Sequence, residues 1–159
     1  MEHFIIRPAQ PQDMEAVLAL IQGLADYEHM SDQVTGTPED MRRAMFEENV
    51  SRCLIAEADG VPVGYAIYFY LYSTFICKKG LFLEDLYLKP DARGKGWGKQ
   101  LIGAVIDVAN RENCCRMEWH CLDWNTPSQE FYKSLGAKPL DAWTGWRLTR
   151  SDIEALADG

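Results

Sequence analysis

Apolar residues recur at helical spacing in two segments of the first 50 residues. Between residues 11 and 27 the intervals of three and four predict a helix with one buried face. That face consists of Met14, Val17, Leu18, Ile21, Leu24 and Ala25. A second helix is predicted to begin at residues 37–40, where a capping threonine precedes a proline and two acids. Its buried side consists of Met41, Ala44 and Met45.

Strand-like segments flank and follow these helices. Residues 4–7 form a short apolar strand that ends at Pro8, and residues 52–58 and 61–72 are rich in β-branched and aromatic side chains. Asp59-Gly60 between the last two is a strong signal for a two-residue hairpin. Residues 81–88 continue the pattern. Together these segments predict an antiparallel meander.

The order of elements changes after residue 88. Apolar residues at helical spacing predict a helix over residues 98–111, and residues 116–122 alternate as a strand. A strand, a helix and a strand in succession imply a right-handed crossover and parallel pairing. The sheet is therefore expected to be mixed.

The last 35 residues contain two helix starts. Thr126 with Gln129 has the spacing of a capping box, and Gly136 is expected to end that helix in the left-handed conformation. A strand pair is expected near residues 138–140 and 143–148, before a helix capped by Ser151 with Glu154. The predicted fold class is α/β (α+β): a single domain over residues 1–159 with a mixed, mostly antiparallel sheet flanked by helices.

Charge is distributed unevenly along the chain. The formal net charge is -8, and residues 1–75 contain 12 acids and 4 bases, whereas residues 76–159 contain 12 of each. A nucleic-acid partner would need a basic face, so that class is disfavoured, while an acidic half would attract a small cationic substrate. The alternative is an acidic surface that serves solubility. No apolar run approaches the length of a membrane span, so a cytoplasmic protein without a membrane partner is expected.

Five cysteines lack regular spacing, which predicts reduced thiols that serve mainly in packing. Cys114, Cys115, His120 and Cys121 are the nearest approach to a metal-ligand set. No Cys-x-x-Cys is present, and strand alternation would send His120 and Cys121 to opposite faces. No metal site is therefore expected.

A basic glycine-rich turn lies between the strand at 81–88 and the helix that follows. Arg93, Gly96 and Gly98 form an Arg-x-x-Gly-x-Gly pattern, which differs from the dinucleotide-binding and P-loop patterns. Glycines allow positive φ and close approach, and the first amides of a helix lack intrahelical acceptors. With Lys95 and Lys99 nearby, these amides predict a phosphate site. The alternative is a glycine-rich connection with surface lysines.

This arrangement of a meander, an Arg-x-x-Gly-x-Gly loop and a later strand and helix resembles the GNAT acetyltransferases. Six blocks in order resemble their diamine (spermidine/spermine) and thialysine acetyltransferase branch. They are Phe4–Ala9, Tyr27-Glu28, Leu83-Glu84-Asp85, Asp123-Trp124-Asn125, Phe131-Tyr132-Lys133 and Gly145-Trp146-Arg147.

The resemblance implies acetyl-CoA as the acyl donor and a small-molecule amine as the acceptor. The implied cofactor contacts fall on one strand end, the glycine loop and the later helix. They are Leu86, Tyr87, Leu88, Arg93, Gly94, Lys95, Gly96, Trp97, Gly98, Lys99, Asn125, Thr126, Pro127, Ser128, Tyr132 and Lys133. A splayed strand would present unpaired amide groups to the pantetheine arm. The resemblance also implies a homodimer.

Two residues match the catalytic positions of the family. An alkylammonium has a pKa of about 10 and must lose a proton before attack, and Glu84 resembles the carboxylate that takes it through a water. A role for Glu84 in orienting the substrate is the alternative. Tyr132 would protonate the departing thiolate, because phenol and thiol pKa values of about 10 and 8.5 allow that transfer. Helical spacing alone would favour a packing role for Tyr132.

The acceptor pocket implied by the resemblance is acidic and aromatic. Its residues are Tyr27, Glu28, Glu84, Asp85 and Trp146, with the strand residues Glu118, Trp119 and His120 facing the same cleft. Acids would bind a distal ammonium and an aromatic ring its methylenes. Ser73 and the run at 122–125 resemble the thialysine group, so both polyamine and thialysine-like acceptors stay open. A catalytically silent CoA-binding or interaction module and a protein N-acetyltransferase are the other function classes.

Overall fold

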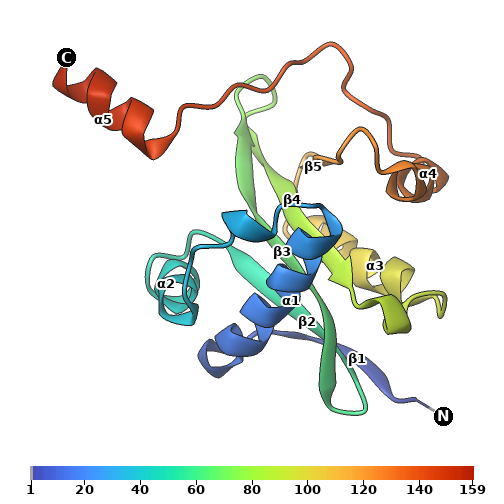
Figure 1. The fold of residues 1–159 in the computed structure, drawn as a ribbon. Coiled ribbons are helices and arrows are strands. Elements are labelled where there is room, and N and C mark those ends of the chain that lie inside the picture. The colour runs from blue at the N-terminus through green and yellow to red at the C-terminus, as the bar shows by residue number, and fades with distance from the viewer. Residues whose placement is uncertain (1) are drawn as a thin grey trace. The chain divides into compact units, whose positions relative to one another are not determined.

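A five-stranded sheet organises the first part of the chain (Figure 1). The computed structural model describes residues 2–159 as two units, one extending to His120 and the other Cys121–Gly159. In the first unit the strands follow the order β1-β2-β3-β4-β5. They are β1 (Phe4–Pro8), β2 (Arg52–Ala58), β3 (Val61–Ser73), β4 (Lys78–Leu88) and β5 (Met117–Trp119). Because each unit is described by itself, a single domain over the whole chain stays a prediction.

The mixed sheet is confirmed. Strands β1 to β4 pair antiparallel, and β5 pairs parallel to β4. The β2–β3 hairpin turns at Asp59 and Gly60, whose φ values of 51° and 81° are those that a type I′ turn requires. Strand β5 is shorter than the predicted 116–122, because its ladder with β4 ends at Leu83 opposite Trp119.

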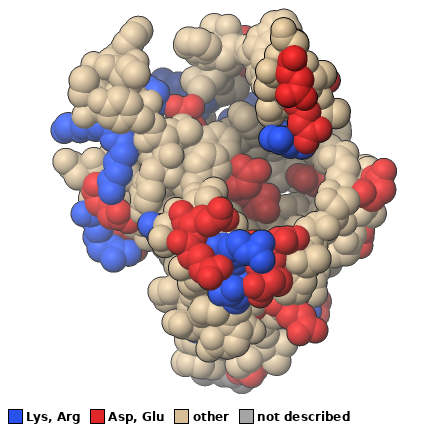
Figure 2. Space-filling view, turned by 90° about the vertical axis from the view of Figure 1, so that its left-hand side faces the viewer, with Lys and Arg blue, Asp and Glu red and all other residues tan. Residues whose placement is uncertain are grey.

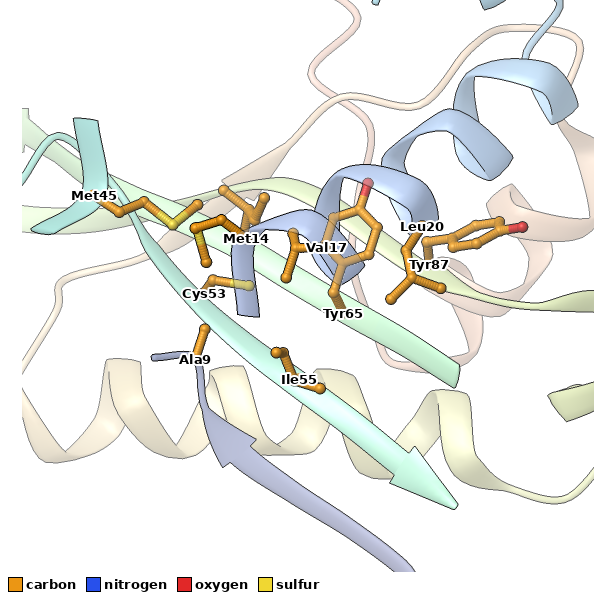
Figure 3. Packing of buried hydrophobic residues seen from close by; sticks show 10 residues of the cluster. Ala9, Met14, Val17, Leu20, Met45, Cys53, Ile55, Tyr65 and Tyr87 are labelled. Carbon is orange, nitrogen blue, oxygen red and sulfur yellow. The ribbon is translucent and has the colours of Figure 1, made fainter. Parts of the chain in front are cut away.

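Helices cover both faces of this sheet. The predicted first helix is a 3₁₀ turn, η1 (Pro11–Asp13), that continues into α1 (Met14–Tyr27). Helix α2 (Pro38–Arg42) begins with the expected Thr37 cap, whose hydroxyl accepts from the Asp40 amide, and passes into a π-helical turn, η3 (Arg43–Glu47). Short turns η2 (Ser31–Gln33) and η4 (Pro90–Ala92) precede α2 and α3 (Trp97–Arg111). Figure 3 shows α1 on one side of the strands and α3 on the other.

On the α1 side of the sheet, the hydrophobic core packs this helix against residues of β2, β3 and β4 (Figure 3). Val17, Ile55 and Tyr65 have no exposed surface. The other members are Ala9, Met14, Leu20, Met45, Cys53, Ile67 and Tyr87. Full burial of one such aliphatic or aromatic side chain stabilises the fold by about 1.5–3 kcal/mol.

The cysteines divide by environment. Cys53 lies in the core, and burial raises the pKa of its thiol to about 12, so it serves in packing as expected. Cys77 is exposed in the β3–β4 turn with a φ of 60°, so the packing expectation is wrong there. All five thiols are free in the described chain.

The second unit contains α4 (Thr126–Ser134) and α5 (Arg150–Asp158). Both helices are predicted correctly, but their caps are not. Asn125, one residue earlier than Thr126, accepts from the Ser128 amide, and Thr149 rather than Ser151 caps α5. Asn and Thr in extended or near-extended backbone before the first turn are both strong caps, so the local choice was ambiguous. Gly136 has a φ of 90° and ends α4 as expected.

The strand pair expected near residues 138–140 and 143–148 is wrong. The structure has no strand there, and Trp143 and Trp146 are 79% and 92% exposed. Alternating apolar residues specify a strand only where a partner edge accepts their backbone hydrogen bonds, and Pro139 removes one donor. In residues 2–159 no helix has the length and apolar character needed to cross a bilayer.

Candidate active site

A β-bulge interrupts strand β4 at Glu84. Ile67 of β3 pairs with Asp85 and the next residue, Tyr68, pairs with Leu83, so Glu84 is the extra residue between them. An extra residue bends the strand and changes the face to which the following side chains point. Glu84 is exposed, whereas Asp85 is half-buried. The two predicted acids therefore differ in environment although they are neighbours.

Strand β5 ends opposite the residue that immediately precedes this bulge. The parallel ladder joins residues 81–83 to residues 117–119, and β4 continues to Leu88. On its other edge β4 stays paired with β3 as far as Gly64 opposite Leu88. In the described chain, residues 84–88 thus have one sheet edge that β5 does not cover. This uncovered edge includes Leu86–Leu88, for which the resemblance implies contacts to a pantetheine arm.

The glycine loop has the backbone conformation that a phosphate site needs. Gly94 and Gly96 have φ values of 79° and 80°, and a Cβ atom at either position would meet no atom within 4 Å. Gly96 directly precedes α3, so the first amides of that helix open onto the loop. A left-handed backbone beside open space is typical of close approach to a ligand. An anion would be stabilised there by the helix dipole as well.

The side chains of the loop are already engaged within the protein. Arg93 donates from Nε to the Leu88 carbonyl at 3.0 Å, and its guanidinium carbon lies 5.3 Å from the Tyr27 ring centre and 5.7 Å from that of Tyr87. The Lys95 ammonium pairs with Glu2 and lies 4.7 Å from the Trp97 ring centre. Lys99 is exposed.

Trp97 packs as a core residue. Its ring stacks on Phe4 with centroids 4.5 Å apart, and the side chain is buried. The backbone amide is thus the part of Trp97 that a phosphate group can approach. A Cβ atom added at Gly98 would lie 3.7 Å from Leu88 Cδ1, an ordinary van der Waals distance.

Carboxylates gather beside the bulge on the α1 side. Burial, together with the charges of Glu84 and Glu28, raises the pKa of Asp85 to about 6, against a hydrogen bond from Tyr65 that lowers it. Glu28 follows α1, and burial raises its pKa too. Tyr27 precedes it at the helix end and is 37% exposed. The predicted acceptor residues Tyr27, Glu28, Glu84 and Asp85 thus all belong to this unit.

Most bases of the acidic half are paired locally. Arg7 contacts Asp13 at 2.8 Å and Glu57 at 2.9 Å. Over α2 and η3, Arg42 and Arg43 pair with Glu39 and Glu47. Figure 2 shows Asp and Glu gathered on this side of the molecule with Lys and Arg among them. Because these bases are neutralised by neighbouring acids, the net negative charge of this half comes from its remaining acids.

Strand β5 and the residue after it contain the three remaining predicted residues of the first unit, Glu118, Trp119 and His120. Arg116 pairs with Glu118 at 2.7 Å, and Trp119 lies opposite Leu83 in the sheet. His120 is exposed and packs edge-on against Phe82 with ring centres 5.1 Å apart.

The other predicted residues belong to the second unit, which is described by itself. Asn125 is buried as the cap of α4, and its side-chain oxygen accepts from the Ser128 amide at 3.4 Å. Thr126 and Pro127 form the first turn and are exposed. Tyr132 is half-buried on α4 beside the ring of Phe131, and Lys133 pairs with Glu130 at 3.8 Å. Trp146 is exposed.

Tyr65 is the residue of this region that sequence reasoning missed. Strand periodicity marks it only as buried, and its hydrogen bond to Asp85 spans 20 positions of sequence. The sequence does show a tyrosine on a strand that is predicted to pair with the strand of Glu84 and Asp85. That tyrosine can be matched to Asp85 only when the register of the two strands is known.

The model of the Acetyltransferase (GNAT) family matches residues 20–137. The thialysine N-epsilon-acetyltransferase of Sus scrofa is 38% identical, and the match covers 99% of this chain and 98% of that protein. The spermidine/spermine N(1)-acetyltransferase-like protein 1 of Homo sapiens is 34% identical over 99% of this chain and 24% of its own length.

Solved structures share the fold at lower identity. An integron cassette protein from V. cholerae superposes with a TM-score of 0.82 at 22% identity, covering 98% of each chain. An aminoglycoside N-acetyltransferase in complex with CoA gives a TM-score of 0.74 at 23% identity, covering 93% of this chain and 96% of that one.

Proposed function

Because this chain belongs to the GNAT acetyltransferase family and is an N-acetyltransferase, we propose that it transfers the acetyl group of acetyl-CoA to the primary amine of a small cationic acceptor. The observation that carries the proposal is the edge of β4 that β5 leaves uncovered, followed along the chain by a left-handed glycine loop. Both features lie at the same end of β4, where we propose that the thioester arm and the pyrophosphate bind. The GNAT family uses acetyl-CoA as its acyl donor.

The donor is proposed to lie along the open edge of β4. Backbone groups of residues 86–88 would pair with the pantetheine arm, as an added strand pairs with a sheet edge. Amides at the head of α3 and the cations Arg93, Lys95 and Lys99 would bind the pyrophosphate. Residues 125–128 and Lys133 are proposed to contact the donor from the second unit.

The reaction needs one base and one acid. The acceptor arrives as an ammonium ion, loses a proton and attacks the thioester carbonyl; the C–S bond then breaks and the sulfur takes a proton. Tyr132 is the proposed acid for the thiolate. The resemblance makes Glu84, acting through a water, the first candidate for the base, with orientation of the substrate as its alternative role; its exposed position at the bulge gives it access to solvent. Its neighbour Asp85 is the second carboxylate within the same strand.

A thialysine-like or lysine-like amino acid is the acceptor class we favour over a polyamine. Ser73 is buried at the end of β3, and its hydroxyl accepts from the Ile76 amide at 3.3 Å. By the resemblance, the enzymes of the polyamine branch have an acidic residue at this position, whereas Ser73 is neutral. Fewer acids suit an acceptor with fewer positive charges. The thialysine N-epsilon-acetyltransferase similarity at 38% identity supports the same choice.

One assay separates the candidate activities. CoA release from acetyl-CoA is followed with thialysine, lysine and ornithine, with putrescine and spermidine, and with peptides bearing free N-termini. We expect the highest kcat/KM for one of the amino acids. Preference for the polyamines would move the acceptor to that branch, preference for peptides would indicate a protein N-acetyltransferase, and CoA binding without release would indicate a silent module. A homodimer and a cytoplasmic location stay predictions.

A further inference from the structure

The phenol of Tyr65 is fully buried and hydrogen-bonds to the carboxylate of Asp85. Its hydroxyl donates to Asp85 Oδ2 at 3.0 Å, and the side chain has no exposed surface. Burial and the nearby Asp85 charge raise the pKa of Tyr65 far above its ordinary value, so the phenol keeps its proton and can donate it to Asp85. The interaction therefore fixes one oxygen of Asp85 and leaves Oδ1 for another partner.

The bulge at Glu84 is what brings Asp85 to this phenol. Residues paired across an antiparallel ladder share a face, so Asp85 lies on the face of Ile67, its partner, and of Tyr65, two residues earlier. That face packs against α1. Tyr68 and its partner Leu83, on the other side of the bulge, belong to the opposite face. The extra residue thus allows an acid to point into the α1 side of the sheet.

The ionisable groups around Asp85 come from four elements. Glu84 lies on β4 beside Asp85, Glu28 follows α1, and Tyr65 is on β3. On β2, the pKa of the Cys53 thiol is raised in part by the Asp85 charge. Both neighbouring carboxylates and burial favour the protonated form, and Tyr65 opposes them. A carboxylate with a pKa of about 6 is better matched to proton abstraction near neutral pH than an ordinary one.

We propose that Asp85 accepts the proton of the acceptor ammonium at Oδ1, that Tyr65 is the positioning residue that holds Oδ2, and that Glu84 orients the ammonium from the exposed side of the bulge. The inference rests on the proposed function. One N–H bond of the ammonium breaks as an O–H bond forms on Asp85, and the freed lone pair attacks the thioester carbonyl. The nitrogen loses a second proton as the C–S bond breaks, and the sulfur gains one, so the cycle releases one net proton to solvent.

The test is the pH dependence of kcat/KM between pH 5 and 8 in Tyr65→Phe, Asp85→Asn and Glu84→Gln. In the unmodified enzyme kcat/KM should rise with a midpoint near pH 6, because the anion is the active form. Tyr65→Phe should move the midpoint to higher pH, since the hydrogen bond that favours the anion is lost. Asp85→Asn should lower kcat/KM by roughly 10²–10³ and abolish the rise, as expected for loss of a general base.

Glu84→Gln should lower kcat/KM but keep the midpoint. Tyr68→Phe is the matched control, because it removes a buried hydroxyl from the same strand on the opposite face; its profile should equal that of the unmodified enzyme. The proposal is overturned if Glu84→Gln abolishes the rise while Asp85→Asn keeps it, or if Tyr65→Phe leaves the midpoint unchanged.

A second measurement separates this inference from the proposed function. The side-chain carboxyl carbon of Asp85 is titrated by NMR in the ligand-free protein, assigned by its absence in Asp85→Asn. A midpoint near 6 that rises in Tyr65→Phe supports the pair without any substrate. An ordinary midpoint near 4 overturns the inference even if acetyl transfer is observed. Acetyl transfer to no amine of the panel overturns the proposed function.

Discussion

Arg93 donates to the carbonyl of Leu88 at 3.0 Å, which joins the first residue of the glycine loop to the last residue of β4. The same guanidinium lies over the rings of Tyr27 and Tyr87. One side chain therefore contacts the strand end proposed to bind the pantetheine arm and a tyrosine proposed to contact the acceptor. A planar guanidinium makes such combined contacts, and an ammonium does so poorly.

Arg93→Ala should weaken acetyl-CoA binding by roughly 10-fold or more, the size expected when a hydrogen bond to a charged group is lost. Arg93→Lys should recover part of that loss, because the charge remains while the ring contacts and the planar donor do not. Isothermal titration calorimetry with acetyl-CoA measures both. Arg43→Ala, which removes an exposed arginine from η3, is the control and should bind as the unmodified protein does. An unchanged dissociation constant in Arg93→Ala would remove Arg93 from the donor site.

Tyr132→Phe should lower kcat by about 10²-fold or more while the dissociation constant of acetyl-CoA stays unchanged. The phenol is proposed to act only when the thiolate leaves, so its loss affects the chemical step. Turnover under saturating donor and acceptor, combined with calorimetry, separates the two quantities. Tyr72→Phe, at an exposed position on β3, serves as the control. Full turnover in Tyr132→Phe would contradict the assignment.

Gly64→Ala should destabilise the protein and loosen the end of β4. A Cβ at residue 64 would lie 2.5 Å from the Tyr87 carbonyl oxygen and 2.5 Å from Leu88 Cδ2. The backbone atom cannot rotate away, so overpacking should cost about 1–3 kcal/mol of unfolding free energy. Thermal denaturation should show a Tm lower by several degrees, and acetyl-CoA should bind more weakly. Gly36→Ala, where no atom lies within 4 Å, should change neither quantity.

Asp85→Asn should stabilise the protein, and by more at higher pH. The Asp85 carboxyl keeps its proton up to about pH 6 in the folded chain, against an ordinary pKa of 3.8. Between those values the folded state binds more protons than the unfolded state, so this group lowers the unfolding free energy as pH rises. The advantage of Asp85→Asn should grow by up to about 3 kcal/mol from pH 4 to pH 7. Urea denaturation across that range measures it, and a pH-independent difference would contradict the burial of an ionised Asp85.

Local chemistry made part of this fold predictable from the sequence. Asp59-Gly60 determines its hairpin because both residues tolerate positive φ, and Thr37 determines a helix start through its own hydroxyl. The glycine loop was predictable for the same reason, since Gly94 and Gly96 adopt the left-handed conformation.

The features that required the structure depend on strand register. The bulge at Glu84 and the contact between Tyr65 and Asp85 follow from how β3 aligns with β4, and one residue of shift would send Asp85 to the other face. The prediction of a strand pair near Trp143 was wrong because apolar and polar residues alternate there but no strand of the described chain pairs with them. Sequence patterns at single segments carry no information on such pairings.

Steady-state release of CoA from acetyl-CoA in the presence of thialysine, lysine or a diamine tests the acetyl-transfer function most directly. Acetyl transfer to the terminal amine, shown by mass spectrometry of the acceptor and saturable in both substrates, is the predicted result. Tight acetyl-CoA binding with no acetylated product from any of these amines would contradict it.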